Sequence, residues 1–175
     1  MIRVAKLSPR QRQLLNGLFI TGSVLLCLLL SPTRLPGMAL LGIGPNWFLI
    51  WVVTWSLKHK VLSSVIAGLI LGLLQDSMSS SYPSHVIVLI LVGFITARLQ
   101  RHIKEDLITI VLLVFILTLV AEAMIALQYA LLEIRPIDEI WLDYQRIALS
   151  CAILSSLWTP AFYYPLHSWW EKLQQ

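Results

Sequence analysis

Charged residues are scarce in this 175-residue chain, and the scarcity indicates which solvent surrounds it. Asp, Glu, Lys and Arg make up 13% of the residues, whereas 58% are hydrophobic and the mean hydropathy is +0.79. A soluble domain needs a polar surface and typically carries about a quarter charged residues. Because long apolar runs recur along the whole chain, we predict an all-α integral membrane protein.

Catalytic and metal-binding motifs are also lacking. The cysteines and histidines follow no zinc-site spacing, and the chain has neither a glycine-rich phosphate loop nor a Gly-x-Ser-x-Gly elbow. We therefore expect no enzyme activity, no metal and no cofactor. Cys27 and Cys151 are expected to be small apolar fillers at similar depth, with a disulfide between them as the alternative.

Six apolar segments are predicted to enter or cross the membrane. Several are shorter than the roughly 20 residues of a perpendicular span, so we expect a compact bundle of six helices, some of them short or broken, in a single domain over residues 1–175. Helix ends inside the membrane then need protein partners, because lipid offers no hydrogen bonds. The segments cover approximately residues 14–30, 45–57, 61–75, 83–99, 107–132 and 147–166.

Basic residues are distributed unevenly between the two sets of loops. Most of the 13 Lys and Arg residues lie on the side that holds both termini, whereas Arg34, Arg135 and Arg146 lie on the other side. Loops rich in Lys and Arg stay in the cytoplasm, so both termini are predicted to be cytoplasmic. This bias also explains the net charge of +4 without nucleic-acid binding. The acids that accompany the three outer arginines are Glu133, Asp138, Glu139 and Asp143.

Small residues recur at a fixed spacing in the third segment. Ser64, Gly68, Gly72 and Asp76 are four residues apart and so share one helix face. Small side chains at this spacing let another helix approach closely, which favours helix association in lipid. Asp76 precedes a Ser-rich turn and is expected to accept hydrogen bonds from backbone and hydroxyl groups of that turn. A proton or ligand site is the alternative interpretation.

Tryptophans line one face of the second segment. Pro45 and Asn46 predict a helix start, with the proline at the first helical position, and Trp47, Trp51 and Trp55 follow at intervals of four. Trp51 lies at mid-depth, where interfacial anchoring does not explain it and its N–H needs a partner. We therefore predict a docking face for a partner protein's helix, with anchoring of the two outer tryptophans at the membrane interfaces as the alternative.

Glu122 is an acid inside the fifth segment. An ionised carboxylate is costly at that depth, so the residue is by default a functional candidate. Its partner must be neutral, or the group must be protonated, because no Lys or Arg shares the hydrocarbon core. We expect a structural polar clasp; a ligand or proton site and contact with a partner protein are the alternatives. The possible hydrogen-bonding residues are Asn16, Thr21, Ser23, Gln128, Ser155 and Ser156.

These motifs together resemble the bacterial rod shape-determining protein MreD family. The resemblance covers most of the chain: its length, its six spans, its basic amino terminus and the order of its motifs. The motifs are Pro45-Asn46-Trp47 with Trp55 eight positions on, a short basic loop, and Gly68, Gly72 and Asp76 before a Ser-rich turn.

The resemblance implies a non-enzymatic membrane component of the rod complex, which guides lateral peptidoglycan synthesis at the plasma membrane. Its implied partner is the bitopic protein MreC, within an assembly that holds MreB, a SEDS glycosyltransferase and a class-B penicillin-binding protein. The bundle is also similar in shape to the substrate-binding subunits of energy-coupling-factor transporters. Binding of a vitamin-type small molecule for such a transporter is therefore the alternative function.

The charge bias generates a topology prediction. A reporter that is active only outside the cytoplasm should be silent when fused after Gln175 and active when inserted near Asp138, because the two positions lie on opposite sides of the predicted bundle. Activity of the two fusions, measured at matched expression, checks this. An active reporter at the C-terminus would contradict the predicted arrangement of six spans.

Overall fold

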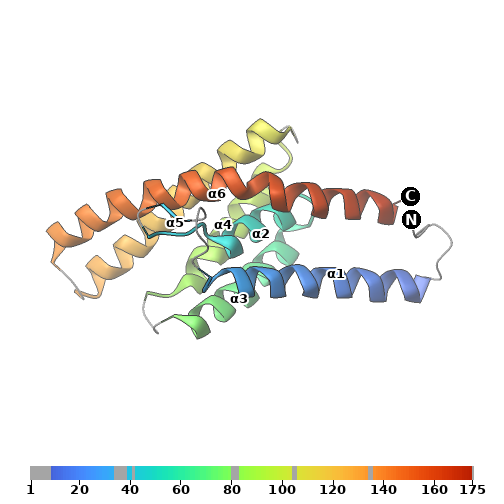
Figure 1. Cartoon of the computed structure of the whole chain (residues 1–175), viewed down its shortest axis with the longest axis horizontal. Helices are drawn as coiled ribbons and strands as arrows, with labels where there is room; N and C mark the ends of the chain where they lie inside the picture. The colour runs from blue at the N-terminus through green and yellow to red at the C-terminus, as the bar shows by residue number, and fades with distance from the viewer. Residues whose placement is uncertain are drawn as a thin grey trace.

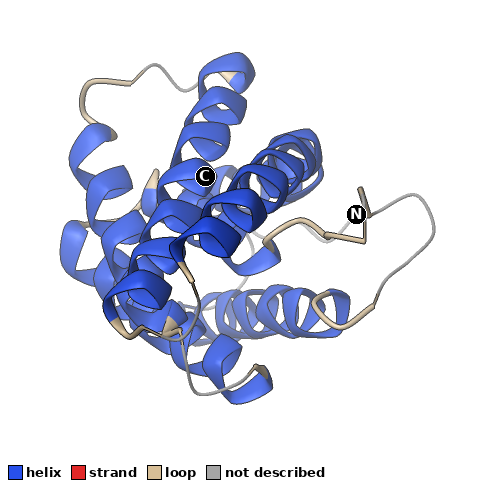
Figure 2. Ribbon diagram, turned by 90° about the vertical axis from the view of Figure 1, so that its left-hand side faces the viewer, coloured by secondary structure: helices blue, strands red, loops and turns tan. Residues whose placement is uncertain are grey.

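The described part of the chain is helical. A computed structural model describes residues 9–33, 39–40, 42–79, 83–103, 106–133 and 136–174 (Figures 1 and 2). Arg34, Arg135 and residues 80–82 of the Ser-rich turn lie outside the described residues. The helices in the described ranges are α1 (Pro9–Leu30), α2 (Trp47–Ser56), α3 (Val61–Met78), α4 (His85–Leu99), α5 (Leu107–Leu131) and α6 (Ile137–Gln174).

The helices differ in whether they can cross a membrane. In the described part of the chain, α1, α3, α5 and α6 are long and apolar enough to do so, whereas α2 and α4 are shorter apolar helices. This confirms the prediction of an all-helical membrane protein in which some helices are short. A helix of 10 residues such as α2 spans only about 15 Å at 1.5 Å per residue, half the thickness of the hydrocarbon core.

The sixth predicted segment differs most from the structure. It was expected at residues 147–166, but α6 is one 38-residue helix that continues through Pro160 and Pro165. Hydropathy detects only the apolar middle of this helix, because its first turns carry acids such as Asp138 and Glu139. Proline is tolerated in membrane helices where neighbouring groups compensate for the missing N–H.

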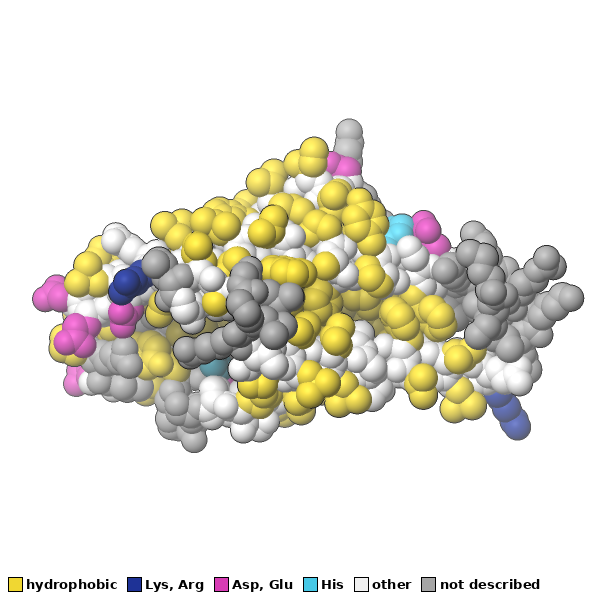
Figure 3. Space-filling view, in the orientation of Figure 1, with side chains coloured by type: hydrophobic (Ala, Val, Ile, Leu, Met, Phe, Trp, Pro, Cys, Tyr) yellow, Lys and Arg dark blue, Asp and Glu magenta, His cyan; other side chains and the backbone are white. Residues whose placement is uncertain are grey.

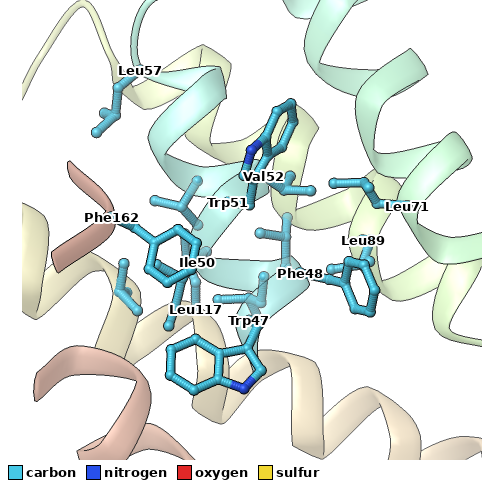
Figure 4. Close-up of a cluster of buried hydrophobic side chains, with 14 of the residues drawn as sticks. Trp47, Phe48, Ile50, Trp51, Val52, Leu57, Leu71, Leu89, Leu117 and Phe162 are labelled. Atoms are coloured by element: carbon cyan, nitrogen blue, oxygen red, sulfur yellow. The ribbon is translucent and has the colours of Figure 1, made fainter. Parts of the chain in front are cut away.

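α2 lies at the centre of the bundle and contacts all five other helices. Nine of its ten residues are buried. Figure 4 shows side chains of other helices around it, among them Leu71 of α3, Leu89 of α4, Leu117 of α5 and Phe162 of α6. A helix that is buried on all sides has no lipid face, so α2 organises the core and the other helices surround it.

The remaining helices pack around α2 in two hairpins and a single helix. α3 packs against α4, and α5 packs against α6 (Figure 1). α1 packs mainly on α2 and leaves large side chains such as Leu14 and Leu18 exposed. The start of α1 and the end of α6 lie at one end of the molecule, and the end of α5 and the start of α6 lie at the opposite end (Figure 1).

Candidate functional site

The predicted small-residue stripe lies where α3 meets α4. A methyl group added at Gly68 would collide with the Leu89 carbonyl, and one added at Gly72 would collide with the Val86 backbone. On the facing helix, a Cβ at Gly93 would come within 2.6 Å of the Ser64 carbonyl oxygen. The two backbones are therefore in direct contact along a seam, which is the close approach that small residues permit in membranes.

Asp76 ends this seam and holds the start of α4. One carboxylate oxygen, Oδ2, accepts a hydrogen bond from the Ser84 hydroxyl at 3.0 Å. The other, Oδ1, accepts from the His85 backbone N–H at 2.7 Å and lies 2.8 Å from His85 Nδ1. The carboxylate lies in the last turn of its own helix, α3, but sits at the positive N-terminus of α4, where an anion is favoured.

Gln128 of α5 completes this arrangement from another part of the chain. Its Oε1 accepts from the Ser84 N–H at 2.8 Å, and its Nε2 donates to the Ser84 carbonyl at 3.1 Å. The residue before α4 is thereby held through both of its backbone polar groups. We call Asp76, Ser84, His85 and Gln128 the α4 start cluster.

The sequence predicted only part of the α4 start cluster. Hydrogen bonds from the turn to Asp76 were expected, since the groups are close in sequence. Gln128 was considered as a partner of Glu122, but its amide bonds Ser84 instead, and the contact of His85 with Asp76 was not predicted. Contacts between groups 9 and 44 residues apart depend on how the helices dock, which local patterns do not encode.

The tryptophan face of α2 lies inside the protein. Trp47 is 4% exposed and Trp51 is 3% exposed, and the Trp51 N–H donates to the Ser23 hydroxyl of α1 at 2.8 Å. Trp55 is half-buried and stacks on Trp51, with ring centroids 5.2 Å apart. The expectation of a partner-binding face is therefore corrected at Trp47 and Trp51, whose indoles are covered by helices of the same chain (Figure 4).

Side chains cap the short α2 helix at both ends. Asn46 Oδ1 accepts from the Leu49 N–H at 3.1 Å, and the Asn46 N–H donates to Ser155 Oγ on α6 at 3.0 Å. Asn46 is thus the N-cap, and Pro45 lies before the helix rather than at its first position. At the other end, the Gln100 amide is assigned the orientation in which its nitrogen faces acceptor groups. In this orientation the nitrogen donates to the Ser56 carbonyl at 2.9 Å.

His59 extends the aromatic stack into the loop after α2. Its ring lies parallel to that of Trp55, with centroids 3.6 Å apart, and meets Trp170 of α6 edge-on. Burial lowers the pKa of His59, although a hydrogen-bond contact with the Trp55 carbonyl at 2.9 Å opposes the shift. A neutral imidazole is therefore favoured near pH 7, which suits stacking on an indole.

Four of the six hydrogen-bonding residues considered for Glu122 interact elsewhere. Ser23 and Ser155 interact with α2, Gln128 belongs to the α4 start cluster, and the Ser156 hydroxyl donates to a carbonyl of its own helix. Glu122 instead lies beside the Cys151 thiol of α6. With Tyr129, Asp143 and Tyr144 it lines a hollow of about 200 Å³ between α5 and the first half of α6.

The two cysteines are free and buried. Cys27 Sγ contacts the Trp47 carbonyl at 3.8 Å, and Cys151 Sγ contacts Ser155 Oγ at the same distance. They thus lie near the start of α2, as small fillers rather than as a disulfide. Among the described residues, no group of three or more His, Cys, Asp or Glu side chains is placed to hold a metal ion.

Comparison with known proteins gives one match. A family model described as rod shape-determining protein MreD matches residues 11–166, nearly the whole chain. The resemblance inferred from the sequence motifs is therefore confirmed at the level of the family. No curated protein and no solved structure matches the chain.

The α3–α4 seam generates a stability prediction. Gly72→Leu should lower the free energy of unfolding by about 1–3 kcal/mol, because the new side chain meets the Val86 backbone, which cannot move aside cheaply. Gly22→Leu on α1 is the matched control, since nothing lies within 4 Å of its Cβ position. The thermal midpoint of the purified protein in detergent checks this. Equal midpoints for the two variants would disprove close contact at the seam.

The α4 start cluster generates a second prediction. Gln128→Ala leaves two backbone groups of Ser84 without partners and should cost about 1–3 kcal/mol for each. Asp76→Ala should destabilise more than Asp76→Asn, because an amide retains one acceptor oxygen. Gln145→Ala, at an exposed position of α6, is the control. Denaturant unfolding in detergent measures the differences, and a Gln128→Ala variant as stable as the control would contradict the assignment.

Proposed function

Because this chain belongs to the MreD family of rod shape-determining proteins, we propose that it is a non-enzymatic membrane scaffold of the bacterial rod complex. In this role it binds MreC and helps to position lateral peptidoglycan synthesis, and it reaches MreB, the SEDS glycosyltransferase and the class-B penicillin-binding protein through the complex. It resides in the plasma membrane with both termini in the cytoplasm. The family match over residues 11–166 is the observation that carries the proposal.

The distribution of apolar surface supports a role in assembly. The interior around α2 is filled by side chains of the chain itself, whereas long apolar faces stay exposed on α1 and on the α5–α6 hairpin (Figure 3). Lipid can cover such faces, and so can the membrane helix of another protein, because helix association in lipid depends on shape and polar contacts. A scaffold needs a well-packed core and exposed faces that a partner can cover. The filled interior around α2 and the exposed apolar faces of α1 and the α5–α6 hairpin fit this need.

The transporter alternative has less support. Sites for small molecules usually occupy about 300–1,000 Å³ and combine an apolar lining with a few polar groups. The hollow beside Glu122 has suitable polar groups, but its volume is about 200 Å³. Of the larger hollows in the described part of the chain, the one of about 830 Å³ is lined by α1 alone, and the one of about 450 Å³ has no charged side chain in its lining. Around α2, the described core is filled by large side chains such as Phe48 and Trp51 (Figure 4). We therefore favour the scaffold over a vitamin-binding subunit.

A crosslinked pull-down tests the proposal. The protein, tagged at its C-terminus and expressed at native level, is crosslinked in native membranes and purified. MreC and the wall synthases should be enriched over an unrelated multi-pass protein with the same tag and abundance. Enrichment of transporter ATPase subunits in their place would overturn the scaffold assignment and favour the alternative.

A further inference from the structure

A chain of polar side chains connects Glu122 of α5 with the start of α2. Glu122 lies beside the Cys151 thiol of α6, and Cys151 Sγ lies 3.8 Å from the Ser155 hydroxyl oxygen on the next turn. Ser155 Oγ accepts a hydrogen bond from the Asn46 N–H at 3.0 Å, and the Asn46 backbone also lies near the Cys151 thiol. Cys151 is 4% exposed and Ser155 is fully buried, so water does not compete for these contacts. We call these four residues the polar relay.

The described residues around Glu122 bring it no cation. Tyr129 of α5 and Asp143 and Tyr144 of α6 are the other titratable side chains that line the hollow beside it, and none of them is basic. Arg146 of α6 is exposed and does not line this hollow. The Cys151 thiol is thus the polar group that Glu122 meets inside the hairpin.

The other helices that pack on α5 supply no cation beside Glu122 either. α2 has no titratable side chain from Trp47 to Ser56. The titratable side chains of α4 belong to its two ends, where His85 contacts Asp76 and Arg98 lies over the Phe94 ring.

These surroundings favour the neutral acid form of Glu122. An ionised carboxylate away from water is costly without a cation, and Asp143 in the same hollow adds a like charge that opposes ionisation. A protonated carboxyl keeps a hydrogen-bond donor, which the Cys151 sulfur can accept.

We propose that Glu122 is a proton-binding site whose occupancy is transmitted through Cys151 and Ser155 to the start of α2. A pH-sensitive device needs a titratable group and an element with two arrangements. Glu122 supplies the first, and the contact of Cys151 with Ser155, in which either atom can donate, supplies the second. α2 contacts all five other helices, so a change at its cap acts at the centre of the bundle. The site does not depend on the proposed function, because a scaffold and a transporter subunit can both respond to acidity.

The polar relay has a different donor order in each protonation state. With Glu122 protonated, its O–H donates to Cys151 Sγ and the thiol donates to Ser155 Oγ. With Glu122 ionised, the thiol turns to donate to the carboxylate and the Ser155 hydroxyl donates to the sulfur. The released proton passes to water beyond the hollow, while Cys151 and Ser155 keep their hydrogens. The oxygen that accepts from the Asn46 N–H is thus bonded differently in the two states.

The pH dependence of stability tests the proton site. The folded protein holds a proton on Glu122 that the unfolded chain has released, so the thermal midpoint in detergent should fall as the pH rises from about 5 to about 8. Glu122→Gln keeps the shape of the neutral acid and should remove this part of the fall. Glu139→Gln, at an exposed position of α6 that does not line the hollow, is the matched control and should keep the wild-type slope. A wild-type slope in Glu122→Gln would overturn the proton site.

Chemical labelling tests the same point on the wild-type protein, so it does not depend on the folding of a variant. An apolar carbodiimide such as dicyclohexylcarbodiimide adds to protonated carboxyl groups and leaves a stable acylurea. In nanodiscs at about pH 7, where an ordinary glutamate is ionised, peptide mass spectrometry should find the adduct at Glu122 at least tenfold more often than at Glu139. Equal labelling of the two acids would contradict a bound proton.

Selective isotope labelling tests the transmission to α2. Asn16 and Asn46 are the two asparagines of the chain, so protein made with backbone-labelled asparagine gives two amide resonances in the NMR spectrum. The Asn46 resonance should move with pH in the wild type and stay fixed in Glu122→Gln. Asn16 of α1 lies outside the polar relay and is the internal control.

Replacement of the middle residue separates the proton site from the relay. Cys151→Ala should keep the carbodiimide adduct at Glu122 and lose the pH-dependent movement of the Asn46 resonance. Cys27→Ala makes the same change at the other buried thiol, which contacts the Trp47 carbonyl, and should keep that movement. An Asn46 resonance that still moves in Cys151→Ala would overturn the relay. The pull-down of rod-complex partners is a separate measurement, so failure of the proposed function and failure of the proton relay are distinguishable.

Discussion

The structure depends on one constraint: the backbone groups at the ends of short helices must be hydrogen-bonded by protein where water is absent. Each such group left unpaired costs about 1–3 kcal/mol, and several would offset most of the stability of a small domain. α2 and α4 are the short helices, and side chains hold their starts. Asn46 and Ser155 hold that of α2, and Asp76 and Gln128 hold that of α4.

The same capping hydrogen bonds fix how helices that are distant in sequence pack against one another. Ser155 lies 109 residues after Asn46, and Gln128 lies 44 residues after Ser84, so each contact joins helices that are distant in sequence. A hydrogen bond with a fixed acceptor position tolerates little sliding of one helix along another. The glycine seam between α3 and α4 restricts sliding in a second way, because only these positions let the backbones touch. Polar caps and steric contact thus specify one packing among many that apolar surfaces alone would allow.

The sequence predicted the features that arise from local spacing. Gly68 and Gly72 share a helix face because they are four residues apart, and Asp76 meets Ser84 because a short turn separates them. It did not predict that Trp51 is buried against α1, since core-facing and lipid-facing positions of a membrane helix are equally apolar and periodicity cannot distinguish them. The prediction of hydrogen-bonding partners for Glu122 was wrong for Gln128, and the contact of His85 with Asp76 was not predicted, because both depend on the docking of whole helices.

Because the chain is synthesised from its amino terminus, each long-range cap can form only after its second partner has been made. α2 leaves the ribosome long before Ser155 of α6 exists, so the Asn46 N–H has no acceptor from that residue until the last helix is made. α4 likewise precedes Gln128 of α5. Both short helices therefore leave the ribosome without one of the side chains that cap them, and their capping is completed only when α5 and α6 have been made. The second half of the chain thus completes the hydrogen bonding of the first half as well as forming a wall of the bundle.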